Sequence, residues 1–186
     1  MLDIGTRPDH LSVMKLVNYF DAHPKVGGLC GELEVESIKG TFSQNFIQAA
    51  QYYEYKSAFS PEKPFESLFG FATALPGAYS MLRLKAIVGS PLDMLFKNVS
   101  RPPTEISCSE ANEYLTEDRI LCLQLYIKPE RGYLVQYIPD AKAFVDAPLN
   151  LAMLMKQRRR WINGTFFCTL RVLTNVASMI SCRRND

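Results

Sequence analysis

Histidine is scarce in this sequence of 186 residues. Its cysteines are odd in number and lack the spacing of a metal site. Only His10 and His23 are present, and neither lies beside a nucleophile motif, so a Ser-His-Asp site is not indicated. The five cysteines show no metal-ligand spacing, which argues against a disulfide framework and a zinc site and favours a reducing compartment. The 21 basic and 19 acidic residues give a net charge of +2, which does not indicate a nucleic-acid partner.

The sequence also has no uninterrupted hydrophobic run of membrane-spanning length. The longest apolar region, residues 162–180, contains Asn163, Arg171 and Asn175, so we do not expect it to cross a bilayer. Residues 1–5 do not show the basic and then apolar pattern of a signal peptide. With 47% apolar and 22% charged residues, the composition is that of a globular domain large enough to have a core.

Helical and strand periodicities alternate along the chain, which indicates the α/β class. Apolar positions three or four residues apart predict helices over residues 8–22, 41–59, 110–126 with a break near Thr116, and 149–161. Short apolar or alternating runs predict the end of a buried strand at 1–5 and strands at 26–30 (extending to 35), within 69–84, at 133–138 and at 143–145. The proline-containing stretches 60–64 and 90–109 are predicted to be a break and a loop.

The first candidate for chemistry is the acidic run Thr116-Glu117-Asp118-Arg119. Carboxylates at the start of a helix lie in a positive backbone field, where one can stay ionised and accept a proton from an attacking hydroxyl. The same run is also typical of an ordinary N-terminal helix cap. Alone, it therefore leaves both interpretations open.

The second candidate is Gln157-Arg158-Arg159-Arg160-Trp161. On a helix, Gln157, Arg160 and Trp161 share one face, where the guanidinium can hold diphosphate oxygens and the indole can pack on a sugar ring. Arg158 and Arg159 are predicted to point elsewhere, toward acidic lipid headgroups or loop carboxylates. The alternative is a solvated basic helix end beside one core tryptophan.

Two further features carry weaker signals. The run Leu75-Pro76-Gly77-Ala78-Tyr79-Ser80 predicts a tight turn whose bare backbone could lie close to a polymer, although an ordinary hairpin turn would look the same. Asp3 follows a predicted strand end, the place where α/β proteins bind ligands, and could hold Mg²⁺ or Mn²⁺. It could equally be a surface residue.

Taken together, these stretches resemble the chitin synthases, which are processive family 2 glycosyltransferases. The resemblance rests on YLTEDRILC at 114–122, QRRRWING at 157–164, LPGAYS at 75–80 and LDIGT at 2–6. The segments CGE at 30–32 and QYYEY at 51–55 add to it, so that it covers about residues 2–168. The ED pair and QxxRW are shared with cellulose and hyaluronan synthases, and the fuller EDRILC and QRRRWxNG forms point to chitin.

The resemblance implies a role for each matching residue. It makes Asp118 the general base, with Glu117 supporting it, and makes Asp3 the ligand of a divalent metal, Mg²⁺ or Mn²⁺. Trp161 would pack on the acceptor sugar. The diphosphate would be held by Gln157, Arg160 and Arg119, and the acceptor would be bordered by Leu75, Pro76 and Gly77. The expected reaction is a single inverting transfer of N-acetylglucosamine from UDP-GlcNAc to the non-reducing end of a chitin chain.

The resemblance also implies an incomplete enzyme. We expect a partial GT-A-like fold, with a mixed sheet and flanking helices, that lacks the N-terminal nucleotide-binding half and is inactive in isolation. Residues 1–147 would be the C-terminal part of the catalytic domain, and 148–186 would form amphipathic interface helices. The parent would reside in the plasma membrane through flanking helices, with this segment on the cytoplasmic side, and could form a homodimer.

Three departures from the family pattern bear mainly on the sugar. Thr116 stands where chitin synthases more often have Ala, Ile162 replaces a usual Leu, and residues 71–75 differ from the usual sequence. Two alternatives therefore stay open: a related synthase making hyaluronan or cellulose, and a non-catalytic remnant whose basic run binds anionic lipid or nucleic acid.

Overall fold

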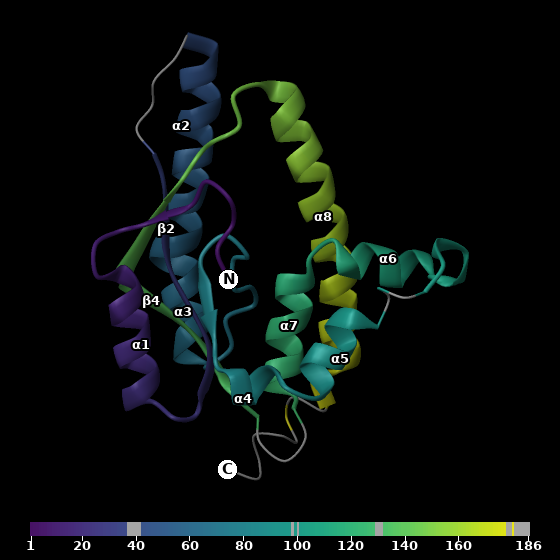
Figure 1. Cartoon of the computed structure of the whole chain (residues 1–186). Helices are drawn as coiled ribbons and strands as arrows, with labels where there is room; N and C mark the ends of the chain where they lie inside the picture. Colours follow the sequence, from purple (N-terminus) through teal and green to yellow (C-terminus); the bar gives the residue numbers. More distant parts are fainter. Residues whose placement is uncertain (37–41, 98, 100, 129–131, 178–179, 181–186) are drawn as a thin grey trace.

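The computed structural model describes residues 1–36, 42–97, 99, 101–128, 132–177 and 180 (Figure 1). Strands and helices interleave along the chain, which confirms the α/β class and the mixed sheet with flanking helices. Among the described helices, none combines the length and the apolarity that a membrane crossing requires.

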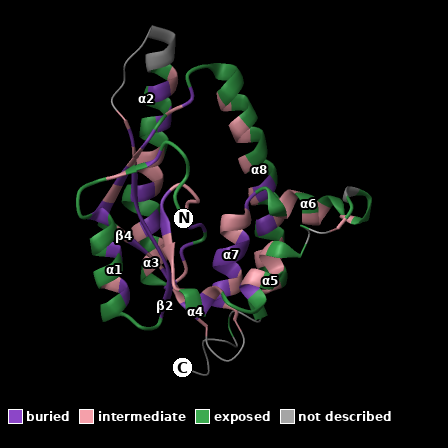
Figure 2. Ribbon diagram, viewed as in Figure 1, coloured by how far each residue is buried: buried purple, intermediate pink, exposed green. Residues whose placement is uncertain are grey.

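A four-stranded sheet of order β1-β4-β2-β3 runs through the described part of the chain. The long strands β2 (Val26–Val35) and β4 (Leu134–Val145) are parallel, whereas β1 (Arg7–Pro8) and β3 (Ser80–Leu82) pair antiparallel at the edges. Both long strands carry many buried residues (Figure 2) because helices cover the sheet. At Gly31, where the β2–β4 register shifts, a Cβ atom would lie 1.8 Å from the Ala141 carbonyl oxygen, so only glycine fits.

The helices pack around this sheet. Helix α1 (Ser12–Ala22) contacts β2 and β4, α2 (Phe42–Ser57) contacts β2, and α7 (Glu117–Tyr126) contacts both long strands. The long helix α8 (Leu151–Thr174) contacts α6 and α7. The remaining helices are the π-helix η1 (Ala58–Glu62), α3 (Lys63–Leu68), α4 (Leu84–Ile87), α5 (Ser90–Phe96), the 3₁₀ turn η2 (Pro103–Glu105) and α6 (Cys108–Tyr114).

The core forms where α1, α7 and the long strands meet. Leu16 of α1, Leu29 of β2, Val135 of β4 and Leu125 of α7 are each at most 1% exposed. Full burial of one such side chain contributes on the order of 2 kcal/mol, so these contacts stabilise the sheet and hold α7 against it.

Two predicted interruptions are wrong. Residues 60–64 continue the helix through η1 and α3, since Pro64 lies in the first turn of α3, where its missing N–H needs no partner. Within 90–109, α5 begins with Pro91 in the same role, and α6 begins at a capping box between Ser107 and Glu110. Pro64 and Pro91 thus mark helix starts, whereas Pro61 lies inside η1.

The N-terminal prediction is also wrong. Residues 1–5 are exposed, and their β-structure is limited to an isolated bridge between Leu2 and Tyr79, so they are not the end of a buried strand. The strand here is β1, and α1 begins at Ser12 rather than near Pro8 because Leu11 adopts a left-handed conformation (φ 63°).

Other predictions hold with changed bounds. The predicted strands at 133–138 and 143–145 are one strand, β4, and the predicted helix 149–161 extends to Thr174. The break near Thr116 is confirmed, since α6 ends at Tyr114 and α7 begins at Glu117.

Candidate functional site

The N-terminal segment lies against the Leu75–Ser80 turn. The Asp3 N–H donates to the Ala78 carbonyl at 3.3 Å, and the Ser80 N–H donates to the Met1 carbonyl at 3.2 Å. The N-terminus lies between α2 and α8 (Figure 1). Two segments separated by some seventy residues of sequence, LDIGT and LPGAYS, are therefore neighbours.

A hydrogen bond joins the Leu75–Ser80 turn to α7. Leu75 is 2% exposed, and its N–H donates to the Cys122 thiol sulfur at 3.1 Å. Pro76 and Gly77 are half-buried, and a Cβ atom on Gly77 would meet only the Met1 methyl group, at 4.0 Å. The side chain of Leu75 thus belongs to the core, which leaves Pro76 and Gly77 as the part of the turn that can border a ligand.

Charges from two other segments of the chain act on the carboxyl group of Glu117. Burial raises the pKa of Glu117, the charges of Asp118 and Asp3 raise it further, and the Arg160 guanidinium lowers it. The charges of Asp3 from the N-terminal segment and of Arg160 from α8 therefore both reach the start of α7. Asp3 and Arg160 are thus both within electrostatic range of Glu117.

Asp118, like Glu117, is half-buried at the start of α7. Burial raises its pKa, while the positive charges of Arg119 and Lys63 lower it. Its Oδ1 accepts the Arg119 N–H at 2.8 Å. A carboxylate with a raised pKa accepts a proton more readily than an ordinary aspartate does, which suits a general base.

Helix α8 supplies a polar face beside this acidic pair. Gln157 and Trp161 are half-buried, and Arg160 is exposed. The Gln157 Oε1 atom is buried and has no hydrogen-bond partner among the described residues. A buried amide left without a partner is costly unless a ligand or water satisfies it, so Gln157 is available for binding.

Arg158 is placed differently from its prediction. Its guanidinium pairs with the Glu54 carboxylate on α2 and donates to Gln51 Oε1 at 2.9 Å. It also lies over the Trp161 ring, 4.6 Å from the centroid. Arg158 therefore joins α8 to α2 rather than pointing toward a loop or a lipid surface.

The side chain of Arg119 lies at a different pocket, although its charge also acts on Asp118. It lines a pocket between α7, α8 and the segment after α3, together with Phe71, Thr73, Leu123 and Thr169. That pocket is bordered by none of the other predicted ligands. Its predicted role in holding diphosphate stays a prediction.

These residues match a known domain. Residues 1–176 match the chitin synthase-like glycosyltransferase domain. The chain belongs to this family. Chitin synthase 2 of Mycosarcoma maydis is 45% identical over 172 residues, which cover 91% of this chain and 16% of that protein. Chitin synthase A of Ampelomyces quisqualis is 37% identical over 180 residues, covering 94% and 20%. Chitin synthase 1 of Phytophthora sojae is 37% identical over 175 residues, covering 94% and 19%.

The chain therefore spans about a sixth to a fifth of the length of these relatives. The relatives bear the name of a glycosyltransferase, which confirms the predicted family and enzyme class. The extent of the match, nearly the whole chain, agrees with the extent of the motif resemblance.

One residue of this chitin synthase-like domain was missed by the sequence analysis. Lys63 at the start of α3 is 8% exposed, and its Nζ donates to Glu66 Oε2 at 2.8 Å. Its charge lowers the pKa of Asp118 and of the buried Cys122. The i,i+3 spacing of Lys63 and Glu66 was the available signal, but residues 60–64 had been interpreted as a break.

Tyr55 on α2 was also missed. Burial raises the pKa of its hydroxyl, and the charges of Arg158 and Asp3 both act on it. A hydrogen bond with Gln51, one turn earlier on α2, lowers this pKa. The Tyr55 hydroxyl is therefore within electrostatic range of both the N-terminal segment and α8.

The side chains in the described part of the chain do not by themselves form a metal site. Among the described residues, no three His, Cys, Asp or Glu side chains are grouped as a metal site would require. Asp3 is exposed, and Mg²⁺ is commonly bound by one or two carboxylates together with phosphate oxygens and water. Asp3 thus fits one position in such a shared coordination shell and does not form a site alone.

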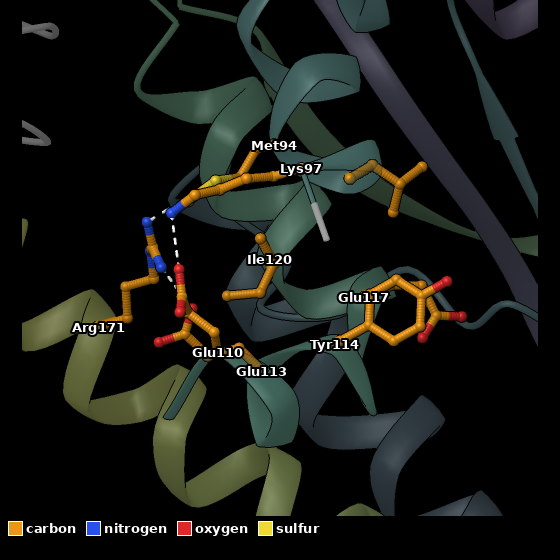
Figure 3. Close-up of a pocket in the computed structure, with 9 residues that line it drawn as sticks. Met94, Lys97, Glu110, Glu113, Tyr114, Glu117, Ile120 and Arg171 are labelled. Atoms are coloured by element: carbon orange, nitrogen blue, oxygen red, sulfur yellow. Dashed lines mark hydrogen bonds and ion pairs between the residues drawn. The ribbon is translucent and has the colours of Figure 1, made fainter. Parts of the chain in front are cut away.

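A pocket between α5, α6, α7 and α8 adjoins Glu117 (Figure 3). Four of its charged groups are paired within the domain: Arg171 pairs with Glu113, and the Lys97 Nζ lies 2.8 Å from Glu110 Oε1. The Nε atom of Arg171 is buried and has no hydrogen-bond partner among the described residues. Glu117 is the carboxylate of the pocket on which the charges of Asp3 and Arg160 also act.

Proposed function

We propose that this chain is the acceptor-side part of the catalytic domain of a chitin synthase. The reaction is an inverting transfer of N-acetylglucosamine from UDP-GlcNAc to the non-reducing end of a growing chitin chain. The observation that carries the proposal is that the charges of Asp3 and Arg160, from two distant segments, both act on Glu117, the neighbour of the half-buried Asp118. The family membership supports the same reaction class.

In this mechanism Asp118 takes the proton from the attacking acceptor hydroxyl. The acceptor oxygen forms a bond to the anomeric carbon as the bond from that carbon to the diphosphate breaks, and UDP leaves with the electron pair. Arg160 and Gln157 hold the diphosphate, and Trp161 packs against the acceptor sugar. No covalent enzyme intermediate forms.

The divalent cation belongs to this proposal as well. Asp3 would hold it together with diphosphate oxygens, and bound Mg²⁺ or Mn²⁺ would offset the charge of the leaving group. The parent enzyme would reside in the plasma membrane, with this segment on its cytoplasmic side. We further propose that the isolated chain is inactive.

The test uses a chimera in which this chain replaces the matching segment of the 45%-identical relative. We expect the chimera to make a polymer from UDP-GlcNAc that chitinase degrades and that hyaluronidase and cellulase leave intact. Asp118→Asn should lower turnover by about a hundred- to ten-thousand-fold, the usual contribution of a general base. Asp21→Asn, an exposed residue of α1, serves as the charge-matched control. Near-normal turnover by Asp118→Asn would contradict the assignment.

A further inference from the structure

The start of α7 touches α8 at one closely packed point. Thr116 is 5% exposed and Cys168 is 4% exposed, and the Thr116 Oγ1 and Cys168 Sγ atoms share a hydrogen bond at 3.0 Å. Gly164, one turn before Cys168 along α8, is buried as well. Gly164 and Cys168 are the buried residues of α8, so this contact is where the helix is most tightly packed against the rest of the domain.

Gly164 has a packing reason to be glycine. A Cβ atom at this position would lie 2.3 Å from Thr116 Cγ2, 2.6 Å from Thr116 Oγ1 and 2.9 Å from Thr116 Cβ. The helix itself would favour alanine, because glycine in a helix interior is less stable by about 1 kcal/mol. The missing side chain is therefore used for close approach of α8 to the residue that precedes α7.

The contact lies between the two halves of the proposed site. Thr116 directly precedes Glu117 and Asp118. Gly164 is four residues after Arg160, one helical turn along α8. A change in the separation at Thr116 and Gly164 would therefore move the acidic pair relative to the guanidinium that would hold diphosphate.

We propose that the Thr116–Gly164–Cys168 contact sets the distance between the general base and the diphosphate-holding face of α8, which makes Gly164 a positioning residue for sugar transfer. The inference rests on the proposed function for the reaction and on the packing for the contact. A displacement of about 1 Å between reacting groups can cost about a hundredfold in rate. A slight opening of the contact is therefore enough to lower the rate of sugar transfer.

The test is carried out in the same chimera, with the variants Gly164→Ala, Thr116→Ala and the double variant. Gly164→Ala should lower kcat by about ten- to hundredfold. It should also raise the rate of alkylation of Cys168, measured by peptide mass spectrometry, by about tenfold as α8 is pushed from α7. Cys30 and Cys122, which are fully buried in the body of the domain, should stay protected and show that the fold is intact.

The double variant distinguishes a specific clash at Thr116 from a general loss of stability, because only a specific clash is relieved by the second substitution. Thr116→Ala removes the two atoms nearest to the added methyl group, so the double variant should recover kcat and Cys168 protection to within about threefold of Thr116→Ala alone. Asn163→Ala, at the exposed neighbouring position, is the labelling control, because it also raises helix propensity but adds nothing toward Thr116.

Three results would overturn the inference: an unchanged kcat in Gly164→Ala, a lost kcat with Cys168 still protected, or a loss that the double variant does not recover. An unsubstituted chimera that makes no chitin would instead count against the proposed function. In that case the labelling of Cys168 still tests the contact. If Cys168 stayed protected in Gly164→Ala, the proposed role of the contact would be refuted.

Discussion

The contribution of Arg158, which links α8 to α2, can be measured as a change in the free energy of unfolding of the chain. Replacing Arg158 with methionine keeps most of the length of the side chain but removes its pairing with Glu54, its hydrogen bond to Gln51 and its contact with the Trp161 ring. The pair is partly exposed, with side-chain exposures of 22% for Arg158 and 48% for Glu54, so solvent weakens it. We therefore assign the ion pair no more than about 1 kcal/mol.

The other two contacts add to this value. A hydrogen bond to a neutral amide contributes about 1 kcal/mol, and a guanidinium over an indole about 0.5–1 kcal/mol. Arg158→Met should thus lower the free energy of unfolding by about 2–3 kcal/mol. Trp161 is the single tryptophan of the chain, so its fluorescence during urea unfolding of the chain reports on this helix.

A double-mutant cycle separates the ion pair from the rest. Arg158→Met and Glu54→Gln, measured singly and together, should give a coupling energy of about 1 kcal/mol that shrinks in high salt. Arg159→Met, exposed and one position along, removes the same charge and should change stability by less than about 0.5 kcal/mol. A coupling energy near zero, or an equal loss in Arg159→Met, would refute the reasoning that Arg158 joins the two helices.

Three further results follow from the site. Lys63→Met removes a positive charge that lowers the pKa of Asp118, so the pKa of this base should rise and the acidic limb of the pH–rate profile of the chimera should move to higher pH, because the base works only when ionised. A profile that stays in place or moves to lower pH would contradict this electrostatic role. Cys122→Ala leaves the buried Leu75 N–H without its acceptor and should lower the free energy of unfolding in urea by about 1–3 kcal/mol, whereas Cys122→Ser keeps an acceptor and should lose less. The isolated chain, incubated with UDP-GlcNAc and a divalent cation, should release no UDP above the background of its Asp118→Asn variant, and sustained release would refute its inactivity.

The fold was predictable wherever the apolar pattern was long. The strand from Val26 and the helix 42–57 were found because a buried strand and a one-faced helix each repeat their pattern many times. The interruption at Thr116 was found as well, because the acidic run that follows it is typical of a helix start. The predictions at 60–64 and 90–109 failed because proline both ends helices and begins them, and only the following residues decide which.

The sequence predicted the residue types of the candidate site but not the distant residues that contact or influence them. Asp118 and Arg160 stand in motifs with short internal spacing, which a sequence displays directly. Lys63 acts on Asp118 across 55 positions of sequence, and Arg158 pairs with Glu54 across 104. Contacts of this kind are made by the packing of whole helices on a sheet, so no local pattern contains them.

One pattern in α8 connects the local sequence motif with the packing of the helix. The positions 157, 161, 164 and 168 recur at intervals of four, three and four, which places them on one stripe of the helix. The stripe is half-buried at its first two positions and buried at Gly164 and Cys168. The same face therefore carries the amide and indole proposed to bind ligand and, one to two turns later, the contact with Thr116. Because a helix is stiff over this length, docking at Gly164 also orients Gln157 and Trp161, and a substitution at the buried end should be felt at the binding end.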